Sequence, residues 1–288
     1  MLTRTVLDRL RDIAAEVERE VASSSPESLR RRLELLDRIE TLSLDPAIDD
    51  DPSLTQLVAD TRAQLDADND QAFSAIRSAI QRGDGARALR EWIASSTSSP
   101  AEDDAYDYVD EIVAGTLQLD DPGPTRVEPT AEMVFYQPTP ARHLFDFFDR
   151  AALAANDVVI DLGSGLGHVA MLTAICTPAR SIGVELEPAY VECAERAART
   201  LNVDRATFIK ADARKAPLAE GTVFFLYTPF SGDMLRAMLV LLRREASFRD
   251  VRVVTFGPCT TTIAAEDWLR SDEPTRAGRI AIFHSHAR

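Results

Sequence analysis

The second half of the chain alternates short apolar runs with amphipathic stretches, and this alternation constrains the fold more than any other feature of the sequence. The runs are 4 to 6 residues long and rich in Val, Ile and Phe, which is typical of buried strands. They lie at 158–162, 181–186, 206–209, 222–227, 251–256 and 279–283, and helical patterns at 169–176, 189–201 and 233–245 separate them. Strands that alternate with helices predict right-handed βαβ units. We therefore expect an α/β fold with a parallel sheet and helices on both faces.

The first 125 residues show helical patterns instead. Apolar residues spaced by three or four mark one face of a helix between Leu2 and Val21, and a second helix is expected to start at Ser25, with Pro26 at its first position. Further helical patterns cover 54–65, 73–80, 89–93 and 101–117. The segment 120–130 contains three prolines and a glycine and is predicted to be a linker. We therefore predict an all-helical N-terminal domain at residues 1–125 and an α/β domain at residues 126–288.

Charge divides the chain at the same place. The net charge of -15 is concentrated in residues 1–130, where 14 basic and 28 acidic residues give -14, whereas residues 131–288 hold 18 and 19 and give -1. An acidic half repels phosphate, so nucleic acid is disfavoured as a partner. The acidic run from Glu102 to Glu111 is expected to be a solvated helix face.

The cysteine count bears on the cellular compartment. Cys176, Cys193 and Cys259 are widely spread and have no CxxC spacing, which excludes a disulfide framework and favours the reduced cytoplasm. Charged residues interrupt the N-terminal apolar positions, so no signal peptide is expected. No apolar run approaches the ~18 residues of a membrane span. His284 and His286 face one way on the last expected strand, but a third ligand is missing nearby in sequence, and we predict no metal site.

A glycine-rich segment follows the first expected strand, in the sequence VVIDLGSGLGHVAML. Gly163, Gly165 and Gly167 allow a tight turn that brings the backbone close to a ligand, and the next helix points its free N–H groups toward that turn. The dinucleotide fingerprint needs its third glycine one place later, where this chain has His168. Asp161 would repel a pyrophosphate and attract a cationic ligand, which disfavours a dinucleotide.

The next two expected strands also end in carboxylates. Glu185 lies 18 residues after Gly167, the position at which a carboxylate at a strand end accepts both hydroxyl hydrogens of a ribose, as it also does in NAD sites. Asp212 follows the third strand and is positioned to accept a hydrogen bond from an adenine amino group. Three successive strand ends therefore predict a nucleoside site.

These motifs carry a resemblance to a known family. VVIDLGSGLG, GVELEP, KADA and FFLYTPF resemble the successive motifs of the class I S-adenosylmethionine-dependent methyltransferases over residues 131–288, and with FYQPTPARHLFDFF they are similar to the non-SET histone-lysine methyltransferases. The resemblance implies a Rossmann-like, doubly wound, mostly parallel sheet of the seven-stranded type, with S-adenosylmethionine as the cofactor. It implies that Glu185 holds the ribose and Asp212 the adenine. The methionine part is assigned to Asp161, Gly163, Ser164, Gly165 and Gly167, with Tyr136 and Thr139 folding over it.

The fourth expected strand ends in Tyr227, Thr228, Pro229 and Phe230. In the resembling amino-methylating families an Asn or Asp stands before Pro-Pro or Pro-Phe here, and this chain departs from that pattern. The end of this strand faces the transferred methyl group in the resembling fold. We therefore expect all four residues to bind the acceptor.

Together these features predict methyl transfer from S-adenosylmethionine to a small-molecule or protein acceptor, with the helical domain forming one wall of the acceptor site. The cofactor already carries an electrophilic methyl group, so the protein mainly has to align the reactants, and no catalytic residue is assigned. Two alternatives stay open. One is a noncatalytic sensor or scaffold that binds the nucleoside cofactor, and the other is an NAD-dependent oxidoreductase, which shares the glycine loop and Glu185. The sequence leaves the acceptor atom and the oligomeric state open.

Overall fold

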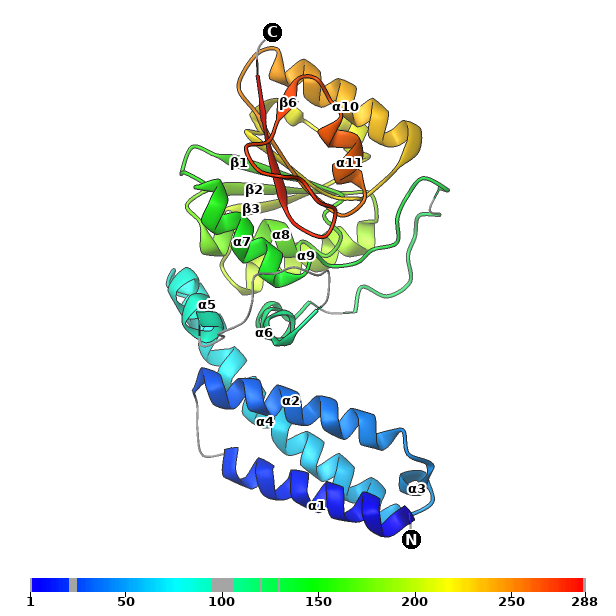
Figure 1. The fold of residues 1–288 in the computed structure, drawn as a ribbon. Coiled ribbons are helices and arrows are strands. Elements are labelled where there is room, and N and C mark those ends of the chain that lie inside the picture. Colours follow the sequence, from blue (N-terminus) through cyan, green and yellow to red (C-terminus); the bar gives the residue numbers. More distant parts are fainter. Residues whose placement is uncertain (1, 21–24, 95–105, 120, 129, 287–288) are drawn as a thin grey trace.

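The computed structural model describes residues 2–20, 25–94, 106–119, 121–128 and 130–286, and its centre is a seven-stranded sheet in the order β3-β2-β1-β4-β5-β7-β6 (Figure 1). Strands β3, β2, β1, β4 and β5 are parallel, and β7 runs antiparallel to both β5 and β6. The strands are β1 Val158–Leu162, β2 Arg180–Glu185, β3 Ala206–Lys210, β4 Val223–Tyr227, β5 Arg252–Phe256, β6 Leu269–Arg270 and β7 Ala281–Ser285. This mostly parallel, doubly wound sheet confirms the predicted fold class.

Helices cover both faces of the sheet, as Figure 1 shows. Helices α7 to α9 lie on one face, while α10 and α11 lie on the other. Their bounds are α7 Ala141–Ala151, α8 His168–Cys176, α9 Pro188–Thr200, α10 Gly232–Ala246 and α11 Cys259–Ala264. Sequence periodicity missed α11 and the two-residue strand β6, because elements this short carry less than two periods of any pattern.

The N-terminal part is helical throughout its described residues. Its helices are α1 Leu2–Glu20, α2 Pro26–Ser43, α3 Pro46–Asp49, α4 Pro52–Gln81, α5 Gly85–Ala94 and α6 Tyr108–Leu117. Ser25 caps α2 through its side chain, as Pro26 at the first position suggested. The two patterns predicted at 54–65 and 73–80 form the single helix α4, because nothing between them breaks a helix.

The helix predicted from residue 101 is shorter than expected. Helix α6 begins at Tyr108, and Asp107 is its N-cap: the Asp107 side chain accepts from a helix N–H, and the Asp110 side chain accepts from the Asp107 N–H. Residues 101–105 lie outside the described residues. The expectation of a purely solvated acidic face was therefore wrong for Asp107 and Asp110, whose carboxylates are engaged in capping and in contacts with α7.

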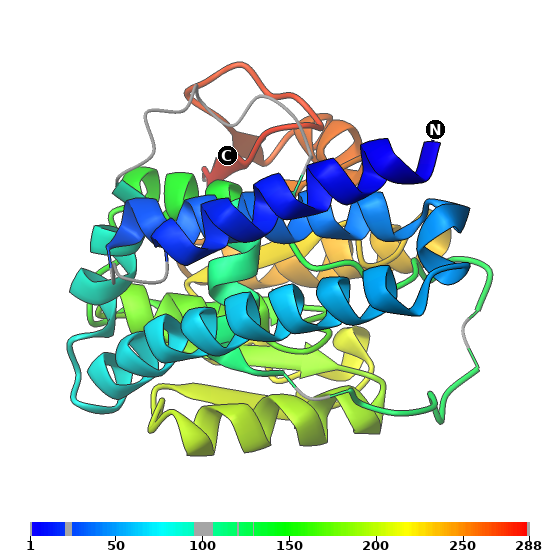
Figure 2. The same cartoon turned by 90° about the horizontal axis from the view of Figure 1, so that it is seen from below.

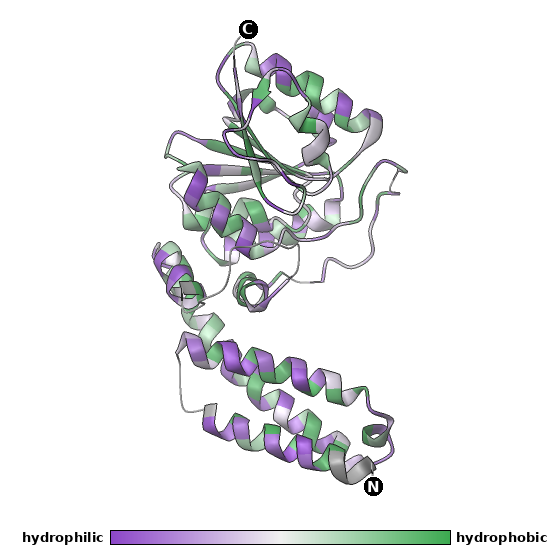
Figure 3. Cartoon of the chain, viewed as in Figure 1, coloured by the Kyte–Doolittle hydropathy of each residue, from purple (hydrophilic) through white to green (hydrophobic). Residues whose placement is uncertain are grey.

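Two apolar clusters hold the sheet between its helices. Strand β1 shows the division, because Val159 packs into one cluster while Val158, Ile160 and Leu162 pack into the other, as expected for side chains that alternate across a strand. The first cluster continues into the helical part through Leu29, and Figure 3 shows the strands as largely hydrophobic. The helical part and the sheet thus share one core, and the domain boundary near residue 125 stays a prediction.

Helices α5 and α6 lie between the N-terminal helices and the α/β part. Helix α5 packs on α8, and α6 contacts α2, α4 and α7. Seen from below in Figure 2, the long helices α1, α2 and α4 lie side by side. Helix α6 therefore links the helical bundle to the helix that precedes β1. Within the described residues, the structure contains no helix that is both long and apolar enough to cross a membrane.

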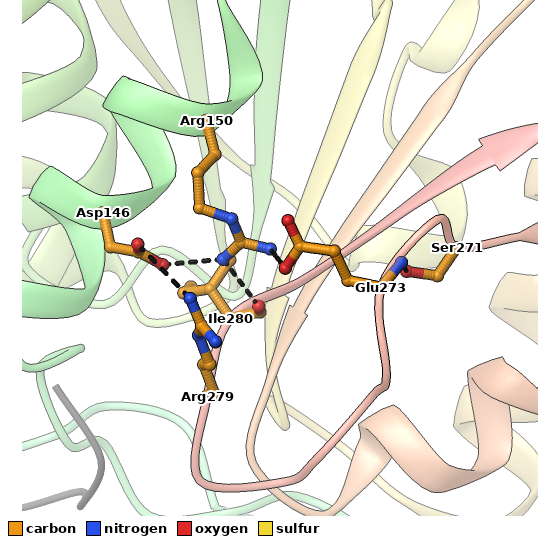
Figure 4. Close-up of polar contacts among 6 residues, drawn as sticks. All are labelled: Asp146, Arg150, Ser271, Glu273, Arg279 and Ile280. Carbon is orange, nitrogen blue, oxygen red and sulfur yellow. Dashed lines mark hydrogen bonds and ion pairs between the residues drawn. The ribbon is translucent and has the colours of Figure 1, made fainter. Parts of the chain in front are cut away.

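An arginine network fixes the loop between β6 and β7 (Figure 4). Arg150 in α7 donates to Asp146 at 2.6 Å, to Glu273 at 2.9 Å and to the Ile280 carbonyl at 3.1 Å. Arg279 makes a longer ion pair with Asp146 at 3.9 Å. Because Glu273 and Ile280 lie at opposite ends of the loop, Arg150 ties both ends to α7.

Candidate functional site

The carboxyl ends of β1, β2 and β3 meet at one edge of the sheet. The register pairs Asp161 with Gly183 across β1 and β2, and Glu185 with Lys210 across β2 and β3. Asp161 is the second-last residue of β1, Glu185 ends β2, and Asp212 follows β3 by two residues. The three predicted carboxylates therefore stand at successive ends of adjacent strands, at the edge where doubly wound sheets bind ligands.

The glycine loop between β1 and α8 has the backbone shape that only glycine adopts without strain. Gly163, Gly165 and Gly167 have φ values of 82°, 52° and 85°. A Cβ on Gly163 would lie 2.4 Å from the Pro229 side chain, and one on Gly165 would lie 2.0 Å from the ring of Tyr136. The loop is therefore closely covered by the end of β4 on one side and by the segment before α7 on the other.

Asp161 is a buried carboxyl group that forms no ion pair with any of the described residues. Its side chain is 3% exposed, and its Oδ2 atom has no hydrogen-bond partner among the described residues. Burial, together with the charge of Glu185, raises the pKa of Asp161 to about 8. The Oγ atom of Ser164, which is also buried, is unpartnered among the same residues. Two buried polar atoms at the glycine loop thus have no partner among the described residues, and unsatisfied buried groups of this kind are rare and costly.

Glu185 already binds the backbone around it. Its Oε2 atom accepts from the Gly165 N–H at 2.9 Å, and its Oε1 atom accepts from Leu186 at 2.7 Å and Glu187 at 2.8 Å. The carboxylate is partly exposed, so it retains lone pairs that face solvent. This arrangement ties the glycine loop to the end of β2. Its contact with a ribose stays a prediction.

Asp212 is paired more tightly than expected. It accepts from the Arg214 side chain at 2.6 Å and from the Arg214 backbone N–H at 2.9 Å. Hydrogen bonding to Arg214 lowers the pKa of Asp212 below its usual value. An adenine amino group would have to share this carboxylate with a guanidinium, and the assignment stays a prediction.

Tyr136 forms the cover of the glycine loop. Its hydroxyl is hydrogen bonded to His168 Nδ1 at 2.9 Å, and its ring lies 5.3 Å from that of Tyr190. Burial raises the pKa of Tyr136 and lowers the pKa of His168 to about 4, so both are neutral at pH 7. Thr139 lies in the same segment and is 6% exposed. His168 and Tyr190 were not predicted as site residues. The only signal for His168 was its position, where the dinucleotide fingerprint has glycine.

The end of β4 is strained and lies directly beside the glycine loop. Thr228 has a φ of 37°, an uncommon value for a β-branched residue, and its hydroxyl donates to the Phe256 carbonyl and accepts from the Cys259 N–H, both at 3.1 Å. Pro229 reaches Gly163, and the ring of Tyr227 packs against Phe256 at 4.8 Å. Phe230, by contrast, is 4% exposed within the second apolar cluster. Acceptor binding by these four residues stays a prediction, and the geometry favours Tyr227 and Pro229 over Phe230.

The described residues before α7 are attached at two places along this edge of the sheet. Near its start, the Arg126 and Val127 N–H groups donate to Glu187, beside the end of β2, at 2.7 and 2.9 Å. Near its end, the Val134 N–H donates to the Pro229 carbonyl at 3.2 Å, beside the end of β4. Because β1 lies between β2 and β4, the described residues 126–127 and 134 are attached on opposite sides of the end of β1. These attachments are not predicted from the sequence, since the local pattern identifies Glu187 only as a helix N-cap before Pro188.

The carboxylate of Glu132 strengthens the second attachment. It accepts from the Asp233 and Met234 N–H groups at 2.9 and 3.0 Å and so caps the N-terminus of α10. Met133 also forms an antiparallel bridge with Phe230. Phe135 follows this attachment, and its side chain is 87% exposed.

A cavity of about 330 Å³ opens beside Tyr136. Helix α6, residues 136–141, α7 and the start of α8 form its walls, and Tyr136, whose ring covers Gly165, is one of the lining residues. Asp110 and Glu111 line it from α6, and burial raises the pKa of both carboxylates. The helical part of the chain therefore reaches the candidate site through α6.

A family model described as histone methylation protein DOT1 matches residues 130–218, less than a third of the 288 residues. The match contains the glycine loop, Glu185 and Asp212. Together with the strand order, it confirms the predicted class: a class I methyltransferase that uses S-adenosylmethionine as its cofactor. No curated protein matches the chain significantly.

Solved structures with a similar fold include several methyltransferases. An RNA methyltransferase from Salinibacter ruber, in complex with S-adenosyl-L-homocysteine, is 24% identical with a TM-score of 0.43, and the alignment covers 52% of this chain and 92% of that one. A precorrin-6y C5,15-methyltransferase from Geobacter metallireducens GS-15 is 16% identical with a TM-score of 0.39, covering 54% and 93%. A SAM-dependent methyltransferase from Geobacter sulfurreducens, in complex with S-adenosyl-L-homocysteine, is 23% identical with a TM-score of 0.34, covering 46% and 51%.

Proposed function

We propose that this protein transfers the methyl group of S-adenosylmethionine to a small-molecule or protein acceptor that binds at the carboxyl end of β4. The observation that carries the proposal is Asp161, a buried carboxylate under the glycine loop whose Oδ2 atom has no partner among the described residues. Burial keeps this carboxyl group largely neutral at pH 7, and its ionised form calls for a neighbouring cation. The ammonium group of a bound methionine moiety supplies one.

The residues present fit the cofactor in other respects as well. Ser164 Oγ is a second buried polar atom available to the methionine part, and Glu185 keeps solvent-facing lone pairs for the two ribose hydroxyls. Asp212 would accept the adenine amino group in competition with Arg214. Tyr136 and Thr139, which lie over the loop, would close the methionine end.

For this reaction the protein mainly has to align the methyl group with the acceptor. The bound cofactor supplies a methyl group made electrophilic by its sulfonium. Alignment of two reactants contributes roughly 7 to 11 kcal/mol to lowering a barrier, so a dedicated base is not needed for every acceptor. In this chain Asp161 and Glu185 would fix the cofactor, while Tyr227 and Pro229 would orient the acceptor beside the glycine loop.

Two observations bear on the acceptor. The matched family is described as acting in histone methylation, and residues 1–130 of this chain carry a net charge of -14. An acidic surface attracts a basic protein segment and repels phosphate, so a basic protein or a small molecule is favoured over nucleic acid. Cys176, Cys193 and Cys259 are free thiols, which supports the reducing cytoplasm as the location.

A noncatalytic cofactor-binding protein is the second candidate. The observation that favours it is the end of β4, where Tyr227-Thr228-Pro229-Phe230 replaces the Asn or Asp of the resembling amino-methylating families. Such a protein would bind the same cofactor through the same carboxylates without turning it over.

Calorimetry with S-adenosylmethionine, S-adenosylhomocysteine and NADH tests the site. We expect the first two to bind and NADH not to bind; binding of NADH alone would refute the proposal. Transfer of a labelled methyl group to histones, to other basic proteins and to a small-molecule panel then separates the enzyme from the noncatalytic alternative. Cofactor binding without transfer to any acceptor favours the alternative.

A further inference from the structure

We propose that helix α6 and the residues just before it position the cofactor-facing segment 136–141, with Tyr106 and Asp110 as the positioning residues, so that the helical part of the chain sets the affinity for the cofactor. This inference rests on the proposed function, because it assigns Tyr136 and Thr139 to the cofactor site. It goes beyond that function because it gives α6 a defined role at the cofactor site. The helix acts there through segment 136–141 and not through the glycine loop.

The segment has little backbone support of its own. Residues 135–139 belong to no helix or strand, and among the described residues no backbone-to-backbone hydrogen bond holds them. Pro138 and Pro140 lack the N–H groups that could make such bonds. Side chains from elsewhere must therefore fix the path of this segment.

Helix α6 and the residues just before it supply those side chains. The Tyr106 hydroxyl donates to the Pro138 carbonyl at 2.7 Å, and Asp110 Oδ1 accepts from the Ala141 N–H at 2.7 Å. Ala141 is the first residue of α7, and the N-cap residue Pro140 makes no side-chain cap. Asp110 thus caps α7 from a different helix, and its carboxylate stabilises the helix N-terminus electrostatically as well.

A third contact secures the same junction. Arg142 in α7 pairs with Asp107, and its guanidinium lies 5.3 Å from the centre of the Tyr108 ring. The guanidinium of Arg30, from α2, lies 5.2 Å from the centre of that ring. The N-terminal end of α6 is thus joined both to the helical bundle and to α7.

At its other end, α6 is anchored on α4. Arg77 donates to the Gly115 carbonyl at 2.7 Å, and a Cβ on Gly115 would lie 2.3 Å from the ring of Phe73. The two ends of α6 therefore differ in what they hold. The Gly115 end holds the helix to α4, whereas the Asp107 end contacts α2 and also holds the segment with Tyr136 and Thr139.

The test compares Tyr106→Phe and Asp110→Ala with Arg77→Ala, a control that weakens only the α4 end of α6. Loss of the single neutral hydrogen bond in Tyr106→Phe should weaken S-adenosylhomocysteine binding about fivefold, with kcat at saturating cofactor within about twofold of the parent. Asp110→Ala should weaken binding more. Asp110→Asn should restore part of the affinity, because its single amide oxygen can still accept from the Ala141 N–H, while the bond that Oδ2 accepts from the Asp107 N–H is lost. Arg77→Ala should lower the unfolding temperature without changing the affinity.

Parent-like affinity in both Tyr106→Phe and Asp110→Ala would overturn the inference, and so would an equal loss in Arg77→Ala. A second readout works without cofactor. Amide hydrogen exchange at residues 136, 137, 139 and 141 should become faster in Tyr106→Phe and Asp110→Ala than in Arg77→Ala. If the parent protein binds no cofactor, the proposed function fails, while this exchange pattern still decides whether α6 positions the segment.

Discussion

The Oε2 atom of Glu185 accepts a hydrogen bond from the backbone N–H of Gly165 at 2.9 Å. This bond joins the carboxylate proposed to hold the ribose to the loop proposed to hold the methionine part. One side chain therefore shapes the loop and, in the proposed function, also holds the ligand.

Replacing Glu185 should consequently affect cofactor binding on two counts. Glu185→Ala removes a charged acceptor from two ribose hydroxyls, each such bond contributing about 1.5 to 3 kcal/mol, and also frees the Gly165 N–H. We expect cofactor affinity to fall by at least about tenfold per lost bond, measured by calorimetry. Glu185→Gln is the matched control, since its amide oxygen keeps one acceptor, and it should bind more tightly than Glu185→Ala. Parent-like binding by Glu185→Ala would show that the ribose lies elsewhere.

Asp161 should give cofactor binding a distinct pH dependence. Its pKa of about 8 in the ligand-free protein means that most molecules carry a neutral Asp161 at pH 7. Pairing with a cationic ammonium favours the ionised form, so binding releases a proton and the affinity should rise with pH until about pH 8. Calorimetry in buffers of different ionisation enthalpy measures this proton directly. An affinity that stays flat from pH 6 to about pH 8 would contradict the assignment.

The same carboxylate should destabilise the protein without cofactor. The pKa of Asp161 is raised from 3.8 to about 8 on folding, so the folded state binds more protons than the unfolded state between these values, and stability falls as pH rises through this window. Asp161→Asn removes the titration. Thermal unfolding at pH 8 should show Asp161→Asn to be more stable than the parent by a few degrees, roughly 1 to 2 kcal/mol, while cofactor binding is lost. A lower unfolding temperature in the variant would contradict the buried, unpaired charge.

Asp212 should matter less than Glu185, because Arg214 already occupies its carboxylate. We expect Asp212→Ala to weaken cofactor binding by no more than about tenfold, the value of one hydrogen bond. Arg214→Ala frees the carboxylate and should leave the affinity unchanged or improve it. A large loss of affinity in Arg214→Ala, measured in the same titrations, would indicate that the guanidinium itself contacts the ligand.

Two residues at the end of β4 should differ in their effects: replacing Tyr227 should impair acceptor turnover, and replacing Phe230 should impair stability. Tyr227→Ala is expected to lower kcat/KM for the acceptor by about tenfold to a hundredfold through misalignment, with cofactor affinity unchanged. Phe230 is 4% exposed, so Phe230→Ala should instead cost about 3 to 5 kcal/mol of stability, as large-to-small changes in a core do. Denaturant unfolding measures the stability of both variants, and steady-state kinetics measure their kcat/KM for the acceptor. A stable but inactive Phe230→Ala would give that ring a direct role with the acceptor.

Much of the fold followed from local patterns. The strand ends could be predicted because a buried parallel strand is a short, continuous apolar run, and Gly163 and Gly165 stood out because a tight loop with positive φ needs glycine. Asp161, Glu185 and Asp212 could be grouped because parallel strands end at a common edge. The N-cap of α6 also has a local signal, because Asp107 and Asp110 stand three residues apart, as in a capping box. From the sequence, these residues are interpreted as part of a solvated face.

The sequence by itself thus determined the sheet, the glycine loop and the three carboxylates, since each depends on residues close together in the chain or on the regular geometry of strands. Only the tertiary structure decided which of these groups already have partners. Glu187 holds Arg126 from 61 residues away, Asp110 caps α7 from α6, and Asp161 keeps an unpartnered oxygen among the described residues. Such contacts leave no periodic trace, because a hydrogen bond between distant segments depends on where the packed helices and strands bring two side chains together, and not on their spacing along the chain.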